Sequence, residues 1–247
     1  MRTLDITPGR TALALVVGLA LAGCAGTDTE TAEEPVETTE TMETPATDEA
    51  APVLKWGDGL VNPNIAGEDE IAAIDGIAPA AVGAIMDGRP FMDMLALDAA
   101  ISPHMDETAR EALYGAMWVP LNLNTASDDE IMLIPGVGDR MAHEFDEYRP
   151  YDGMERFRRE IGKYVDEDVV DTYAMYVFIP IDLNTATDEQ ILMIPGVGDR
   201  MLHEFKEYRP YTSLEQFRRE MGKYVDDGEV DRLTRYVTLS DNQESEE

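Results

Sequence analysis

The stretch Ile134-Pro135-Gly136-Val137-Gly138-Asp139-Arg140 decides the fold, and it recurs unchanged sixty residues later as Ile194-Pro195-Gly196-Val197-Gly198-Asp199-Arg200. Proline after an apolar residue ends one helix, and two glycines permit a tight turn with positive backbone φ. Aspartate then opens the next helix. We call these stretches the second corner (134–140) and the third corner (194–200). Their outward-facing amides make each corner a candidate phosphate site.

An internal repeat of sixty residues sets the domain organisation, because other features recur at the same offset without a gap. They are Asn64, Asn124 and Asn184; Arg89-Pro90-Phe91, Arg149-Pro150-Tyr151 and Arg209-Pro210-Tyr211; and Pro120 and Pro180. We therefore predict three units, at 57–119, 120–179 and 180–240. The second and third are nearly identical, whereas the first has diverged.

The pattern within each unit is helical. Ser127 to Glu130 and Thr187 to Gln190 are capping boxes, and Met141, Phe145 and Tyr148 follow helical spacing. An Arg-Pro pair then stops the helix. No stretch alternates convincingly enough for a strand. We predict an all-α fold in which each unit has four short helices in two hairpins, and in which neighbouring units are free to pack together because sixty residues make a small core.

The N-terminal residues predict export. Residues 1–23 combine a basic start with a short apolar run that ends at Cys24, the chain's single cysteine. This end resembles the lipobox of bacterial lipoproteins, which implies a lipid anchor on Cys24 in the cell envelope, with Ala25 favouring the outer membrane. The alternative is an ordinary signal peptide with an incidental cysteine. Residues 24–56 predict an acidic disordered linker, and 241–247 an acidic tail.

The composition is strongly acidic, with 51 Asp and Glu against 19 Lys and Arg and a formal net charge of −32. Such a surface repels nucleic acid at low ionic strength. Adaptation to high salt and acidic terminal segments both account for it. No nucleophile, base and orienting residue occur together, so we expect no enzyme, no metal site and no cofactor.

The motif Asn-x-Asn-Thr-Ala at 122–126, with its copy Asp-Leu-Asn-Thr-Ala at 182–186, is joined to Pro-Gly-Val-Gly at 135–138 and 195–198. This combination resembles the tandem helix-hairpin-helix domain of ComEA-like competence proteins. The resemblance implies a helix-hairpin-helix fold of the SAM/HhH-like type. It also implies binding to the backbone of double-stranded DNA without sequence specificity. The implied contact residues are Gly136, Val137, Gly138 and Arg140, with Gly196, Val197, Gly198 and Arg200; we add Lys163 and Lys223 of the second hairpins.

Three features depart from that resemblance. The second hairpins keep only one glycine, and the first unit has Asp75 and Ala78 in place of proline and the second glycine. We therefore expect the first unit to be structural. The third departure is charge: residues 180–239 hold twelve acidic and eight basic residues, net −4, and 120–179 hold fourteen and six, net −8. The third unit is therefore favoured for DNA, through a local basic patch.

Two functions remain open at this point. The first is an envelope-anchored DNA-binding protein that acts in DNA uptake. Its main-chain amides would bind the phosphates of the DNA backbone. The second is a non-enzymatic scaffold that docks a protein partner in an envelope assembly. The intact glycine corners favour the first function, and the net charge favours the second.

Overall fold

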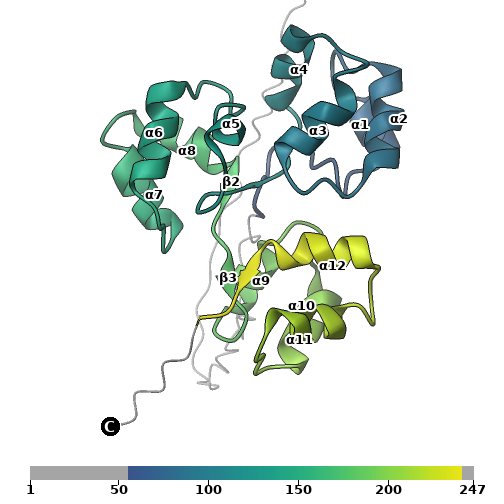
Figure 1. Cartoon of the computed structure of the whole chain (residues 1–247), viewed down its shortest axis with the longest axis vertical. Coiled ribbons are helices and arrows are strands. Elements are labelled where there is room, and N and C mark those ends of the chain that lie inside the picture. Colours follow the sequence, from purple (N-terminus) through teal and green to yellow (C-terminus); the bar gives the residue numbers. More distant parts are fainter. Residues whose placement is uncertain (1–54, 241–247) are drawn as a thin grey trace, which may run out of the picture. The chain divides into compact units, whose positions relative to one another are not determined.

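A computed structural model describes residues 55–240 of the chain, and these residues are mainly helical (Figure 1). The helix-rich class is therefore confirmed. The predicted signal segment, Cys24, most of the predicted linker and the acidic tail lie outside the described residues. Within 55–240, no helix is long and apolar enough to cross a membrane.

The first, second and third segments (57–119, 120–179 and 180–240) each contain four helices in the same order. The first has α1 (Glu68–Ala72), α2 (Pro79–Gly88), α3 (Met94–Ile101) and α4 (Glu107–Tyr114). The second has α5 (Asp128–Ile131), α6 (Asp139–Glu147), α7 (Met154–Ile161) and α8 (Glu167–Ala174). The third has α9 (Asp188–Leu192), α10 (Asp199–Glu207), α11 (Leu214–Met221) and α12 (Asp227–Thr234).

Short parallel strands join the beginning and the end of the later segments. Strand β1 (Leu121–Asn122) pairs with β2 (Val177–Phe178), and β3 (Ile181–Asp182) pairs with β4 (Val237–Thr238). A single bridge between Val61 and Met117 does the same in the first segment. The sequence prediction of no strand was wrong here, because a two-residue strand is too short to show alternation.

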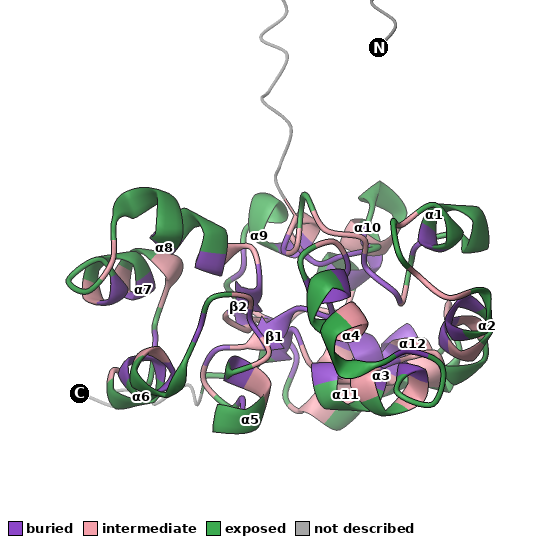
Figure 2. Cartoon of the chain, turned by 90° about the horizontal axis from the view of Figure 1, so that it is seen from above, coloured by how far each residue is buried: buried purple, intermediate pink, exposed green. Residues whose placement is uncertain are grey.

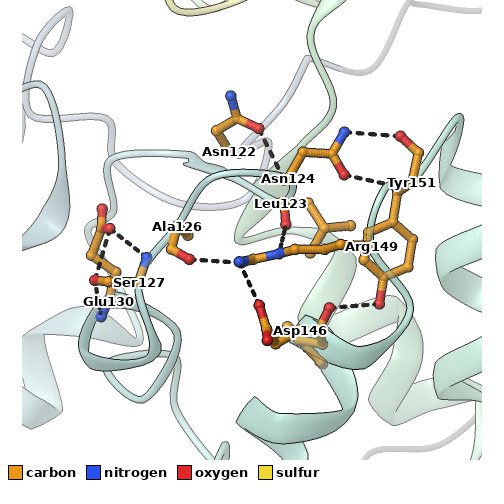
Figure 3. A network of polar contacts seen from close by, with 10 residues as sticks. Asn122, Leu123, Asn124, Ala126, Ser127, Glu130, Asp146, Arg149 and Tyr151 are labelled. Carbon is orange, nitrogen blue, oxygen red and sulfur yellow. Dashed lines mark hydrogen bonds and ion pairs between the residues drawn. The ribbon is translucent and has the colours of Figure 1, made fainter.

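An asparagine clamp joins two loops of each segment, and Figure 3 shows the clamp of the second segment. The Asn124 Nδ2 donates to the Tyr151 carbonyl at 2.9 Å, and the Tyr151 amide donates to Asn124 Oδ1 at 2.7 Å. Arg149 Nη2 adds a bond of 2.7 Å to the Ala126 carbonyl. The same bonds recur at the equivalent residues of the other segments, Asn64, Phe91 and Arg89, and Asn184, Tyr211 and Arg209. The repeated Asn and Arg-Pro positions therefore have a structural role.

Aromatic side chains fill the core of the second segment. Phe145 meets Phe157 edge-on at 5.2 Å between ring centroids, and Tyr151 lies 5.8 Å from Phe157. Trp118 at the end of the first segment donates its indole N–H to the Tyr176 carbonyl at 2.8 Å, so the first two segments share one core. Figure 2 colours the buried residues of the described part purple.

Lys55 and Trp56 correct one predicted boundary, because we placed them at the end of the disordered linker. Trp56 is only 8% exposed, and its ring stacks on Tyr236 with centroids 5.6 Å apart. Its amide donates to the Met193 carbonyl at 2.9 Å. The folded part therefore begins by Lys55, on the surface of the third segment. A lone tryptophan in an acidic stretch is the sequence signal that marks this boundary.

Candidate functional site: the glycine corners

The second and third corners have nearly the same backbone. The φ of Gly136 is +84° and that of Gly196 is +83°, a conformation that favours glycine. Gly138 has φ −118° and takes the N-cap position of α6, so Asp139 is the first helical residue. The sequence predicted that aspartate opens the helix, and the structure moves the cap back by one residue.

Five amides at each corner have no acceptor among residues 55–240. At the second corner they belong to Gly136, Gly138, Asp139, Arg140 and Met141, since the first bond of α6 is from the Ala142 amide to the Gly138 carbonyl at 3.0 Å. The third corner has the equivalent set, at Gly196, Gly198, Asp199, Arg200 and Met201. Unfilled amides at a helix N-terminus carry a partial positive charge that attracts anions.

Other helices of the same segments have side-chain caps, which shows what the corners lack. Ser127 and Glu130 form a complete capping box on α5, and Thr187 and Gln190 form one on α9, as the sequence predicted. Neither Gly138 nor Gly198 offers a side chain for this purpose. The corners therefore leave donors available where α5 and α9, the preceding helix of each segment, have theirs capped.

The first corner, 74–80, keeps the positive φ at Gly76 (+81°) but offers fewer donors. Proline at position 79 has no amide, and the Ala81 amide already donates to the Ala78 carbonyl at 2.9 Å. Its anion-binding capacity is correspondingly lower than that of the other two corners.

Val137 and Val197 were predicted as contact residues, and the structure contradicts this. Both side chains are buried, at 9% and 2% exposure. Both amides donate inside the turn, to the carbonyls of Ile134 and Ile194 at 3.0 Å. Their role is to anchor the turn to the core, because neither the side chain nor the amide is available to a ligand.

Arg140 and Arg200, also predicted contacts, lie exposed in the first turn of α6 and α10. Within the described residues, neither guanidinium has an ion-pair partner within 4.0 Å, so both are available to a ligand. Each stands next to an exposed acid, Asp139 or Asp199. The two charges of each pair offset one another, so the main-chain donors determine whether an anion is favoured at the corner.

Lys163 and Lys223 were the other predicted contacts, but their charges are already engaged. Lys163 Nζ pairs with Glu160 and lies 4.8 Å from the centroid of the Tyr148 ring. Lys223 does the same with Glu220 and Tyr208. The hydrogen bond raises the pKa of each lysine and lowers the pKa of its glutamate partner. We therefore remove both lysines from the candidate site.

The basic patch predicted for the third segment presents less free positive charge than its composition suggests, because seven of its eight basic side chains bind other groups of the chain. Lys206, Arg218, Arg219, Lys223 and Arg232 pair with carboxylates, and Arg209 and Arg235 donate to main-chain carbonyls. Arg200 is the exception within the described residues. In the second segment, Arg158 and Arg159 form surface ion pairs with Asp171 and Glu160.

The surroundings of the two corners differ. Lys55 Nζ donates to the carbonyls of Leu192 and Val197 at 2.7 and 2.6 Å, and Ile65 packs close to Gly196. The second corner has a single such contact, from the Tyr173 hydroxyl to the Gly136 carbonyl at 3.1 Å. The third corner is thus partly covered, although the sequence favoured it for binding.

A shallow hollow of about 480 Å³ adjoins the second corner. Gly138, Asp139, Arg140, Met141 and the exposed Tyr164 line it. The Tyr164 hydroxyl bonds to that of Tyr148 at 2.8 Å, so the second hairpin is fixed beside the first. Sequence reasoning missed Tyr164, since nothing in the pattern places the two hairpin turns side by side.

No protein-family model, no curated protein and no solved structure matches this chain. The residues 55–240 also hold no group of three or more His, Cys, Asp or Glu placed to bind a metal ion. Geometry and electrostatics are therefore the basis on which the corners are interpreted.

Proposed function

We propose that the chain is a non-enzymatic, envelope-anchored protein of tandem helix-hairpin-helix units that binds double-stranded DNA without sequence specificity. In this proposal the lipid anchor is on Cys24, the acidic linker is a spacer, and the later two corners bind phosphate oxygens. DNA uptake is the process that such a tethered binder suits.

The single observation that carries the proposal is the set of amides without acceptors at the exposed second corner: Gly136, Gly138, Asp139, Arg140 and Met141. Backbone N–H groups at a helix N-terminus bind phosphate without reading a base. The second corner is the primary site of the proposal because the third is partly covered by Lys55 and Ile65.

The net charge of −32 opposes DNA binding, but this repulsion acts over a longer distance than the contacts at the corners. At about 0.15 M salt the Debye length is roughly 8 Å, so distant carboxylates are screened while a corner amide touches its phosphate. Two corners on one chain also add effective concentration to weak sites.

The test is binding of mixed-sequence duplex DNA to the full-length chain across a salt series. Each phosphate neutralised by Arg140 or Arg200 should contribute about −0.9 to the slope of log K against log salt, so the slope should be negative and no steeper than about −2. The Gly138→Asp/Gly198→Asp protein should lose binding, because each new carboxylate caps the amides and repels phosphate.

The matched control is Gly138→Ala/Gly198→Ala. No atom lies within 4 Å of a Cβ built at either position, so we expect both double variants to fold, and alanine leaves the amides free. Retention of DNA binding by the alanine protein and loss by the aspartate protein supports the proposal. Equal affinity of the two variants, or no binding by the unmodified chain, rejects it.

The second candidate is a protein–protein scaffold, and the partial covering of the third corner favours it. There the chain already uses a hairpin turn to dock another segment of itself, through Lys55, Trp56 and Ile65. A partner segment with a Lys and an apolar side chain would dock on the second corner in the same way. This function would be supported if the Gly138→Ala protein binds a synthetic peptide of residues 53–66 and does not bind DNA.

A further inference from the structure

The N-terminal residues Lys55 and Trp56 dock on the carbonyl groups of the third corner and of the helix before it. Lys55 Nζ donates to the carbonyls of Leu192 and Val197 at 2.7 and 2.6 Å. The Trp56 amide donates to the Met193 carbonyl at 2.9 Å. The last carbonyls of a helix such as α9 lack partners within the helix, and a lysine ammonium with its three donors suits them.

The second corner has the same three carbonyls without a donor. They belong to Met132, Leu133 and Val137, the residues sixty positions before the three acceptors of the third corner. None of them accepts a hydrogen bond from residues 55–240. Val137 is 9% exposed against 2% for Val197, and Met132 is 38% exposed. The second corner therefore presents an open copy of a surface that is covered at the third corner.

Exposed apolar side chains accompany these carbonyls. Five large apolar side chains are exposed in the described part, and three of them belong to the second segment: Met132, Tyr164 and Val169. Tyr164 lines the hollow beside the corner, and Val169 lies one helical turn before Tyr173, whose hydroxyl contacts the corner. At the third corner Ile65 of the docked segment makes the apolar contact. The second corner offers a partner an apolar contact of the same kind.

The occupant comes from another protein, because all four lysines of this chain lie in the described residues and are engaged. Lys55 occupies the third corner, and Lys163, Lys206 and Lys223 pair with carboxylates. In a second copy the same lysines are engaged in the same way. The formal net charge of −32 and the exposed Asp139 beside the corner favour a positively charged partner.

We propose that the carbonyl side of the second corner docks an extended, lysine-bearing segment of a basic partner protein. The lysine ammonium binds the carbonyls of Met132 and Val137, and a main-chain amide of the segment binds the Leu133 carbonyl. An apolar side chain of the partner packs on Met132 and Val169. This docking rests on the second candidate function, the scaffold, and specifies the binding atoms and the chemistry of the partner.

Docking on the carbonyls leaves the amides of a corner free. At the third corner Lys55 occupies two carbonyls, and the amides of Gly196, Gly198 and Asp199 still have no acceptor among the described residues. A partner lysine and a phosphate therefore use different atoms of the second corner, and each can be tested without the other.

The test is fluorescence anisotropy of a labelled synthetic peptide of residues 53–66, titrated with the full-length chain in the absence of DNA. This peptide contains Lys55, Trp56 and Ile65, which contact the third corner in the chain itself. We expect saturable binding. The peptide with Lys55→Met should bind about tenfold more weakly, because hydrogen bonds from a charged donor are lost.

The protein variant Met132→Arg tests where the peptide binds. Met132 is exposed, so we expect the variant to fold, and its guanidinium should weaken peptide binding about tenfold because it repels the lysine and competes for the carbonyls. The matched control is Leu95→Arg, which adds the same charge at a side chain of the first segment that is 41% exposed. The control should change the affinity by less than about twofold, since distant charges are screened.

The proposal is overturned if the peptide shows no saturable binding, or if Lys55→Met leaves its affinity unchanged. It is also overturned if the Met132→Arg and Leu95→Arg proteins bind the peptide equally tightly, because the peptide then binds away from the second corner. If Met132→Arg fails to fold, Val169→Arg at the same surface replaces it. No DNA is present, so none of these outcomes decides whether the amides bind phosphate.

Discussion

The second and third corners have one sequence and one backbone, yet they differ in what surrounds them. Residues 134–140 and 194–200 are identical, and the φ angles of Gly136 and Gly196 agree within a degree. Two nearby positions differ: Tyr173 is replaced by Leu233, and Thr172 by Arg232. The N-terminal residues Lys55 and Ile65 then meet only the third corner.

This difference shows that a short motif determines the backbone conformation of a turn but not how accessible the turn is to a ligand. A turn closes within seven residues, so its sequence is sufficient to specify it. Access depends on side chains from segments that lie more than a hundred residues away, as for Lys55 and Val197. Two copies of a motif therefore need separate functional tests.

The largest expected difference between the corners is in DNA affinity. Gly138→Asp alone should weaken binding about tenfold or more, and Gly198→Asp alone by no more than about twofold, because a new carboxylate matters most at the open corner. Fluorescence anisotropy with a labelled duplex measures both. A larger loss from Gly198→Asp would reverse the assignment of the primary site.

The next effect is on stability. Gly136→Ala should cost about 1 kcal/mol and Gly196→Ala about 2 kcal/mol of unfolding free energy, because positive φ strains any side chain. A Cβ on Gly196 would also lie 3.1 Å from Arg232 Nη2 and 3.2 Å from Ile65 Cγ2, whereas the nearest atom to Gly136 is 3.8 Å away. Urea unfolding measures both.

The control for these two variants is Gly138→Ala, which should lose little stability because Gly138 has φ −118°. If Gly136→Ala and Gly196→Ala lose the same unfolding free energy, the contacts around Gly196 can move to make room for the methyl group. The proposed structural difference between the two corners would then be contradicted.

A smaller effect tests the one contact that covers the second corner. Tyr173→Phe removes the hydroxyl that donates to the Gly136 carbonyl at 3.1 Å and should cost about 1 kcal/mol. The third segment has Leu233 at this position and no such bond. Chemical denaturation measures the change, and an unchanged midpoint would show that water replaces the hydroxyl at no cost.

The smallest effect is a pH dependence confined to the third corner. Burial lowers the pKa of Lys55, and Asp58 and Asp199 offset it in part. The folded state therefore releases this proton at a lower pH than the unfolded state. Below the folded pKa the cost of burying the charge is present in full. It is relieved as pH rises through the folded pKa toward the ordinary value of 10.5.

Lys55→Met removes this ionisable group, so the unfolding free energy of the variant should rise less between pH 9 and 10.5 than that of the unmodified chain. Thermal unfolding at several pH values provides the comparison, with Lys163→Met as the control for a lysine of the second segment. Parallel curves for Lys55→Met and the unmodified chain would contradict the prediction.

The parts of the fold that depend on neighbouring residues were predictable. The capping boxes at Ser127 and Thr187 and the helix stops before Arg-Pro all formed as expected. Predictions about which charged groups are free failed more often. Lys163 and Lys223 are three residues from a glutamate on the same helix turn, a spacing that the sequence displays but that we did not weigh.

The sequence by itself determined where helices start and stop, and where a left-handed glycine is required, because these depend on interactions within a few residues. Tertiary structure alone decided the asparagine clamp between Asn124 and Tyr151, the parallel pairing of β1 with β2, and the docking of Trp56 on the third segment. Such contacts join residues far apart in the chain. Their energies depend on burial and geometry that exist only once the segments have packed.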